Sequence, residues 1–219
     1  LTKSIGMSTA LAGTIPLIGK IWDAVTDPFM GNICERTHSR LGAKRFYILV
    51  GSVLSAVFFA LLWLVPPWSG PVAQYIYYVA TYMLFATGFT IVMVPYNALL
   101  PDMVDDYTTR SRFSGTRMIF STFGAILAGL IPTILIRDNT DARSYFFVAC
   151  IFSVIFFIVI LATFFGSWER EKKPLRVGFR ESLTQSFTVY RCRSFRLFLL
   201  IFLCGQGSAD FVTGMAVYY

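Results

Sequence analysis

The sequence predicts an all-α membrane protein, a polytopic bundle of about six transmembrane helices. The chain of 219 residues is 56% hydrophobic and only 14% charged, whereas a soluble domain carries about 25% charged residues. No charged residue occurs between Arg45 and Asp102, a stretch long enough for two spans of about 20 residues each. One soluble core could not bury so much apolar surface, and so hydrophobic a chain is not disordered. The apolar runs are continuous rather than alternating, which favours helices over a barrel.

Six hydrophobic segments account for these helices. The second and third are separated by a Pro- and Gly-rich stretch at 66–71, which predicts a tight turn. The first segment differs from the others because it carries Lys20, Asp23 and Asp27, and the last carries Asp210. The expected spans are 5–34, 46–65, 73–100, 114–136, 145–167 and 196–219.

The basic residues indicate the orientation of these spans. Lys and Arg gather in the loops 35–45, 101–113 and 168–196, whereas the loop 65–72 has none. This is the positive-inside pattern, which places the three basic loops in the cytoplasm. The pattern explains the net charge of +7 without nucleic-acid binding. We expect a multi-pass protein of the cell membrane, with the lipid bilayer and no nucleic acid as partner.

The long loop 168–196 is expected to contain an interfacial helix. Its apolar residues recur near helical spacing among Arg, Ser and Gln, and they are Val177, Leu183, Phe187 and Tyr190. Nothing in the chain resembles a soluble active site: there is no phosphate loop, no Ser/His/Asp set and no dinucleotide fingerprint. The single histidine, His38, lies in a basic loop. We therefore expect neither an enzyme nor a cofactor.

Two acids in the first span need a physical explanation, because an ionised side chain at a helix centre costs about 2.5–3.5 kcal/mol on insertion scales. Asp23 and Asp27 are spaced i, i+4 and share one helix face, so one of them is protonated or a cation lies beside them. Lys20 lies on the same stripe. Pro28 frees the carbonyl of Ala24, which adds an oxygen that suits Na⁺ or Li⁺. Alternatively, Lys20 and Asp23 form an interhelical ion pair and Asp27 caps a kink.

Other polar residues in the spans are weaker candidates. Arg117 either snorkels to the cytoplasmic interface or offers a hydrogen-bonding fork to a polar solute. Asp210 either lines a pathway or pairs with another residue, and Gly124 and Gly129 are expected to allow close helix packing. A polar line along the third span either lines a cavity or belongs to a kinked packing helix. This line consists of Thr87, Gly88, Thr90, Pro95, Tyr96 and Asn97.

Several segments resemble a known family. The first span contains IWDAVTDPFMG at 21–31, which is similar to the second-helix signature of the glycoside–pentoside–hexuronide:cation symporters, the melibiose permease branch of the major facilitator superfamily. The segments 36–42, 94–101, 112–117 and 213–219 resemble later parts of the same family. The resemblance implies helices 2 to 7 of a twelve-helix transporter. It divides the chain into N-terminal-half helices at 1–167, an inter-half loop at 168–195 and the start of a C-terminal half at 196–219, and we expect a piece of a larger protein.

The resemblance also implies site residues. It gives Asp23, Asp27 and Thr90 to a cation site, with Na⁺ as a possible metal ion, and it gives Arg117 to the solute. We place Asn97 and Asp210 with Arg117 in the solute site. Two positions depart from melibiose permease, which has Asp where this chain has Met93 and Trp where it has Asn97. These departures leave Na⁺ and H⁺ both open as the coupling ion.

The expected function is cation-coupled symport, driven by Na⁺ or H⁺, of a sugar or glycoside-like solute by alternating access in a monomer. One alternative is a proton-coupled or uncoupled carrier of another solute, including a lysophospholipid-like one. A second alternative is a non-transporting membrane protein whose acids form structural ion pairs.

Overall fold

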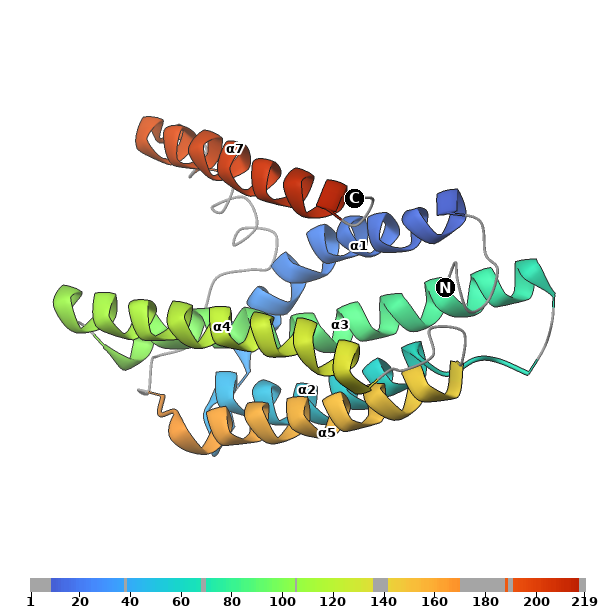
Figure 1. Ribbon diagram of the computed structural model, residues 1–219. Helices are drawn as coiled ribbons and strands as arrows, with labels where there is room; N and C mark the ends of the chain where they lie inside the picture. Colours follow the sequence, from blue (N-terminus) through green and yellow to red (C-terminus); the bar gives the residue numbers. More distant parts are fainter. Residues whose placement is uncertain are drawn as a thin grey trace. The chain divides into compact units, whose positions relative to one another are not determined.

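The described part of the chain is a helical bundle (Figure 1). The computed structural model describes residues 9–37, 39–67, 70–104, 106–135, 142–169, 188 and 191–216, and these ranges contain no strand. The helices are α1 (Thr9–Arg36), α2 (Ala43–Leu62), α3 (Pro71–Met103), α4 (Tyr107–Leu135), α5 (Ala142–Gly166) and α7 (Arg193–Ala216). The predicted all-α fold is therefore confirmed.

The chain forms two compact units, Leu1–Leu175 and Arg176–Tyr219. The first unit contains α1 to α5, and the second contains α7. The interfacial helix predicted for the loop 168–196 falls mostly on 170–187, which lies outside the described residues, as does His38.

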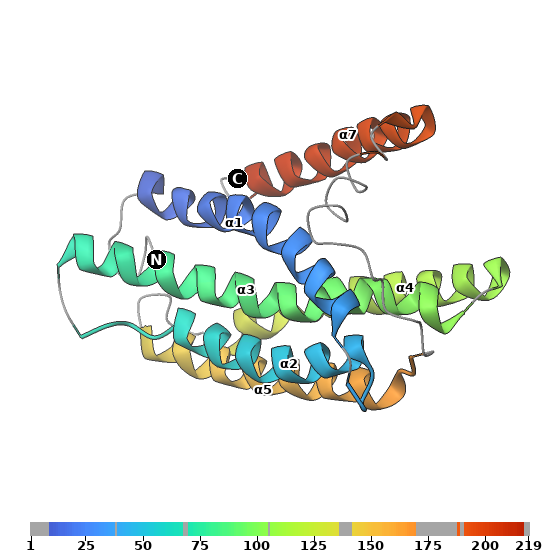
Figure 2. The same ribbon diagram turned by 180° about the vertical axis from the view of Figure 1, so that it is seen from behind.

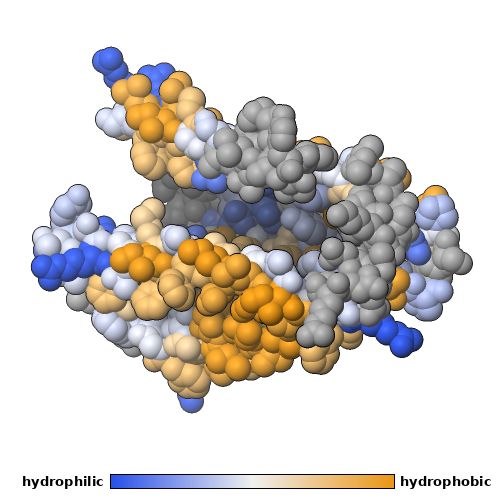
Figure 3. All heavy atoms as spheres, in the orientation of Figure 1, coloured by the Kyte–Doolittle hydropathy of each residue, from blue (hydrophilic) through white to orange (hydrophobic). Residues whose placement is uncertain are grey.

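Four of the described helices are long and apolar enough to cross a membrane, namely α2, α3, α4 and residues 143–166 of α5. The α4 helix has no buried residue, and its Met118 and Phe120 are each 73% exposed. Figure 3 shows apolar side chains gathered over the face formed by α4 and α5. A surface of this kind suits lipid or other membrane helices rather than water, as expected of a multi-pass membrane protein. The first and last expected spans, 5–34 and 196–219, overlap α1 and α7, and these two helices are not among the four.

The α3 helix packs most extensively against α2. Two glycines allow the close approach: a Cβ at Gly51 would lie 2.7 Å from Cγ2 of Val92, and a Cβ at Gly88 would lie 3.1 Å from the backbone of Ser55. The hydroxyl of Ser55 is fully buried and donates to the Gly51 carbonyl within α2. Small residues let membrane helices approach closely and gain van der Waals contact. Gly88, one member of the predicted polar line, is thus a packing residue.

The α4 helix begins seven residues before the predicted span. Asp106 caps it, since the Asp106 carboxylate accepts hydrogen bonds of 2.8 Å from both the backbone N–H and the hydroxyl of Thr109. These bonds, first of all the one from the backbone N–H, hold the pKa of Asp106 below its ordinary value. A capping acid at a helix N-terminus also interacts favourably with the helix dipole.

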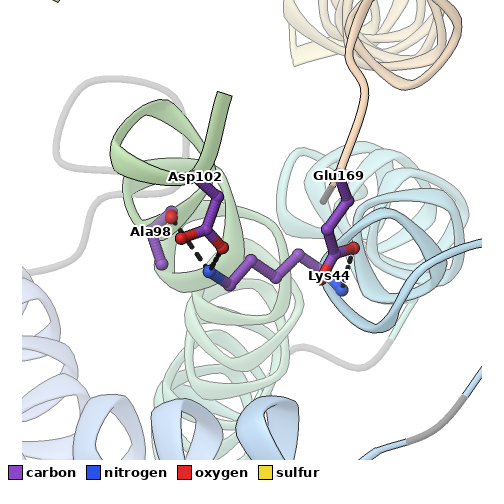
Figure 4. A network of polar contacts seen from close by, with 4 residues as sticks. All are labelled: Lys44, Ala98, Asp102 and Glu169. Atoms are coloured by element: carbon purple, nitrogen blue, oxygen red, sulfur yellow. Dashed lines mark hydrogen bonds and ion pairs between the residues drawn. The ribbon is translucent and has the colours of Figure 1, made fainter. Parts of the chain in front are cut away.

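One polar network joins the start of α2 to the end of α3 and to the residues just after α5 (Figure 4). Lys44, near the start of α2, forms an ion pair with the buried Asp102 of α3, and its Nζ donates to the Ala98 carbonyl at 3.0 Å. The backbone N–H of Lys44 donates to Oε2 of Glu169, just after α5, at 3.0 Å. Glu169 therefore caps α2 from a distant part of the chain, where Gly42 offers no side chain.

Gly42 is the one position in the described chain with a positive φ, at 91°. A Cβ there would lie 2.5 Å from Oε2 of Glu169. We expect Gly42→Ala to destabilise the complete protein by about 1–3 kcal/mol, the usual cost of such backbone strain, and to displace the Glu169 cap. The measurement is the thermal unfolding of the purified protein in detergent.

Gly124→Ala is the matched control, because nothing lies within 4 Å of a Cβ at Gly124 in the described structure. The close packing predicted at Gly124 and Gly129 is wrong for the described residues for this same reason. We expect the control to leave stability unchanged or to raise it, since alanine favours a helix. Equal unfolding temperatures for the two variants would contradict the role given to Gly42.

Candidate functional site

The α1 and α3 helices lie side by side and run in the same direction (Figures 1 and 2). Three side-chain hydrogen bonds link them, each 2.9 Å long, and the bonded residues are separated by 61, 65 and 63 positions in sequence. The near-constant separation shows a parallel pair in register along most of its length. A parallel pair agrees with the topology inferred from charge, in which both spans enter from the outside. The bonded pairs are Thr14–Tyr75, Trp22–Thr87 and Asp27–Thr90.

The Asp27–Thr90 pair brings together two of the predicted cation-site residues. Threonines inside helices commonly donate their hydroxyl to the carbonyl four residues earlier, as Thr87 does to Met83 at 2.8 Å and Thr122 does to Met118 at 3.0 Å. Thr90 instead donates across the interface to Oδ1 of Asp27. Thr90 is buried and Asp27 is exposed, so this carboxylate is fixed on one side and accessible on the other.

Asp23 lies one helical turn before Asp27 on α1 and belongs to the same face. Its Oδ1 is buried and has no hydrogen-bond partner in the described structure. Buried polar oxygens are nearly always paired, so an unpaired one requires an explanation. A cation or a proton on this carboxylate would remove the unsatisfied charge.

The donor set suits a small hard cation. Asp23, Asp27 and Thr90 offer carboxylate and hydroxyl oxygens, and Pro28, inside α1, deprives the Ala24 carbonyl of its usual N–H partner. No group of three or more His, Cys, Asp and Glu side chains that suits a metal ion occurs among the described residues.

The predicted solute-site residues Arg117 and Asn97 also contact one another. Nη2 of Arg117, on α4, donates to Oδ1 of Asn97, on α3, at 2.9 Å. The Arg117 guanidinium lies 4.7 Å from the centre of the Tyr96 ring, a cation–π contact. These contacts join the Arg117 guanidinium to α3, and its two predicted roles, at the membrane interface or toward a polar solute, stay predictions.

The role given to Asp210 in the solute site stays a prediction. The backbone of Asp210 belongs to α7 in the second unit, and its side chain lies outside the described part. Sequence reasoning missed Trp22 as a site residue, although it adjoins Asp23. The sequence predicts no role for Tyr96 beyond its place in the polar line of the third span. No local pattern distinguishes either aromatic residue, since both act through contacts with another helix.

An apolar pocket lies elsewhere, between α2 and α5. It has a volume of about 420 Å³, and its walls include Val53, Val57, Phe146 and Phe157. Binding sites for polar solutes need convergent polar groups, and this pocket has almost none. It is not the candidate solute site.

Comparisons with known proteins now give the family. A model described as MFS/sugar transport protein matches residues 1–219, the whole chain. An uncharacterized symporter of Synechocystis sp. is 39% identical over 148 residues, covering 65% of this chain and 27% of the relative. The isoprimeverose transporter of Lactiplantibacillus pentosus is 30% identical, covering 77% and 36%. The sodium-dependent lysophosphatidylcholine symporter 1 of Xenopus tropicalis is 33% identical, covering 59% and 25%.

The chain spans less than half the length of each of these relatives. Their names and the family description are those of transporters, which confirms the expectation that this protein is not an enzyme. The family model therefore matches every residue of the chain. The chain belongs to the MFS/sugar transport protein family, and its resemblance to the glycoside and cation symporters of the major facilitator superfamily is confirmed.

Proposed function

We propose that the protein is a secondary active transporter that couples the symport of a sugar or glycoside-like solute to Na⁺ or H⁺ by alternating access. The observation that carries this proposal is the Asp27–Thr90 hydrogen bond beside the unpartnered Oδ1 of Asp23. Two acids on one face of a membrane helix are costly unless a cation or proton neutralises them. The energy for transport would come from the gradient of that ion.

The cation would act by neutralising the α1 acids. With the site empty, the two carboxylates repel one another and hold water around them. With the site filled, that region becomes close to neutral, which lowers the cost of the occluded state through which the solute moves. Thr90 would keep Asp27 in place during this change, because its hydroxyl is already committed to that carboxylate.

The solute would bind at Arg117 and Asn97. An arginine fork offers five N–H donors, of which one is used by Asn97 in the described structure. The remaining donors suit sugar hydroxyls, and the exposed Asn97 side chain adds an amide. The printed name of one relative, an isoprimeverose transporter, supports a sugar.

A second candidate is a lysophospholipid-like solute. The named lysophosphatidylcholine symporters among the relatives favour it, as does the exposed apolar surface of α4 next to Arg117. A guanidinium pairs with phosphate as readily as with hydroxyls. Competition by a disaccharide against a lysophospholipid in one uptake assay separates the two solutes.

Thr90→Val tests the cation site, because valine keeps the shape of threonine and removes the hydroxyl. A hydrogen bond to a charged group contributes about 1.5–3 kcal/mol, so we expect roughly a tenfold or greater loss of Na⁺ affinity. The measurement is calorimetry on the complete purified protein at two pH values. A site shared with H⁺ binds Na⁺ more weakly at the lower pH.

Thr122→Val is the control for this experiment, since the Thr122 hydroxyl donates only within its own helix. The Asp23→Asn/Asp27→Asn double variant should bind no Na⁺. Saturable Na⁺ binding that survives in the double variant would refute the site. If the wild type binds no Na⁺ and instead accumulates solute under a pH gradient, the coupling ion is H⁺.

Arg117→Gln tests the solute site. Glutamine keeps one polar group but loses the charge and the fork, so we expect solute uptake to fall at least tenfold while cation binding is retained. Arg112→Gln, earlier on the same helix, is the control and should transport normally. Normal uptake by Arg117→Gln would remove Arg117 from the solute site and favour its role as a contact between α3 and α4.

A further inference from the structure

We propose that Trp22 is a positioning residue for the cation site, acting through its hydrogen bond to Thr87. This inference rests on the proposed function, because it concerns the same acids. Trp22 immediately precedes Asp23 on α1, and Thr87 lies three residues before Thr90 on α3. Each partner of the Trp22–Thr87 bond is therefore a near neighbour of a cation-site residue.

The hydrogen bond has a defined direction. Nε1 of Trp22 donates to Oγ1 of Thr87 at 2.9 Å, and the same hydroxyl donates to the Met83 carbonyl at 2.8 Å. The proton of Thr87 is thus directed to its own helix, which leaves the oxygen as an acceptor for the indole. An indole nitrogen is a donor only, so the hydrogen bond between Trp22 and Thr87 can form in only one direction.

Of the three α1–α3 hydrogen bonds, Trp22–Thr87 and Asp27–Thr90 are the two that lie beside Asp23. On α1 the bonded residues are five residues apart, about 7.5 Å along the helix axis, and Asp23 lies between them. On α3 they are three residues apart and share one face. Without the Trp22–Thr87 bond, Asp27–Thr90 would be the one bond of the three beside Asp23, and α1 could rotate about it there, because Thr14–Tyr75 lies more than two helical turns before Trp22. The two bonds together fix the local register and rotation. The spacing between the Asp23 and Asp27 oxygens and Thr90 is set in this way.

A packing role alone would predict a different outcome. Trp22 is 37% exposed, so its ring does not belong to the buried core. Among the described residues of α3, Thr87 accepts a hydrogen bond from the N–H of Trp22. If Trp22 acts by packing, Phe should replace it without loss of cation affinity. If it acts by positioning, the loss of the N–H should weaken binding. We expect an effect near the lower end of the about 10–100-fold contributed by a direct partner of a metal ligand, because Trp22 and Thr87 act only through the residues next to them.

Trp22→Phe and Thr87→Val remove the two sides of this bond separately. We expect each to raise the cation dissociation constant of the complete protein roughly tenfold, with an unchanged unfolding temperature and little change in the transport rate at saturating cation. The double variant should be no weaker than either single variant, since the two residues make one interaction. Thr87→Ser keeps the hydroxyl and should restore the affinity.

Trp63→Phe is the matched control. Trp63 stacks on Tyr145 at a ring separation of 6.1 Å, between α2 and α5, so the same exchange there should not alter cation affinity. The Thr87→Val and Thr87→Ser pair decides the test if Trp22→Phe does not fold.

Wild-type affinity in Trp22→Phe and in Thr87→Val would overturn the positioning role and leave the proposed function intact. A different result would overturn both: no saturable cation binding by the wild type, or binding that the Asp23→Asn/Asp27→Asn variant retains. An equal loss of affinity in Trp63→Phe would also count against the positioning role, because it would show a general effect of losing an indole.

Discussion

The hydrogen bond from Thr90 to Asp27 is the interaction on which the candidate site depends. An ionised carboxylate on a membrane helix is costly, so each donor that a neighbouring helix supplies contributes substantially to its stability. The Thr90 hydroxyl supplies one such donor, because it bonds to Asp27 instead of to a carbonyl of its own helix. This choice ties α1 to α3 and holds one acid in place while the other, Asp23, keeps a buried and unpartnered oxygen.

The α3 helix is central to the first unit because different faces of it contact different neighbouring helices. Thr87 and Thr90 face α1, Gly88 faces α2, and Asn97 faces α4 through Arg117. A helix contacted on several sides has no single apolar stripe. The described contacts of the polar line along α3 are therefore divided among three interfaces.

This division explains how far the sequence could predict the site. The i, i+4 spacing predicts that Asp23 and Asp27 share a face, and family resemblance indicates Thr90 and Arg117. The long apolar runs also predict the spans themselves. None of these signals could predict the Trp22–Thr87 bond, because that contact depends on the register between two helices far apart in sequence. For the same reason, Gly124 and Gly129 have the pattern of a packing motif although no described helix packs there.

The cation and solute residues are connected through one helix. Thr90 and Asn97 are seven residues apart on α3, two helical turns and about 10 Å along the axis. Pro95, fully buried between them, removes the hydrogen bond that the Ile91 carbonyl would otherwise accept. In the proposed function, binding at Asp27 and Thr90 fixes one side of this proline while Arg117 holds the other side. A helix with one missing bond between two anchored turns bends at lower cost than an intact helix. The proposed ion and solute sites therefore lie on opposite sides of the turn of α3 that is easiest to bend.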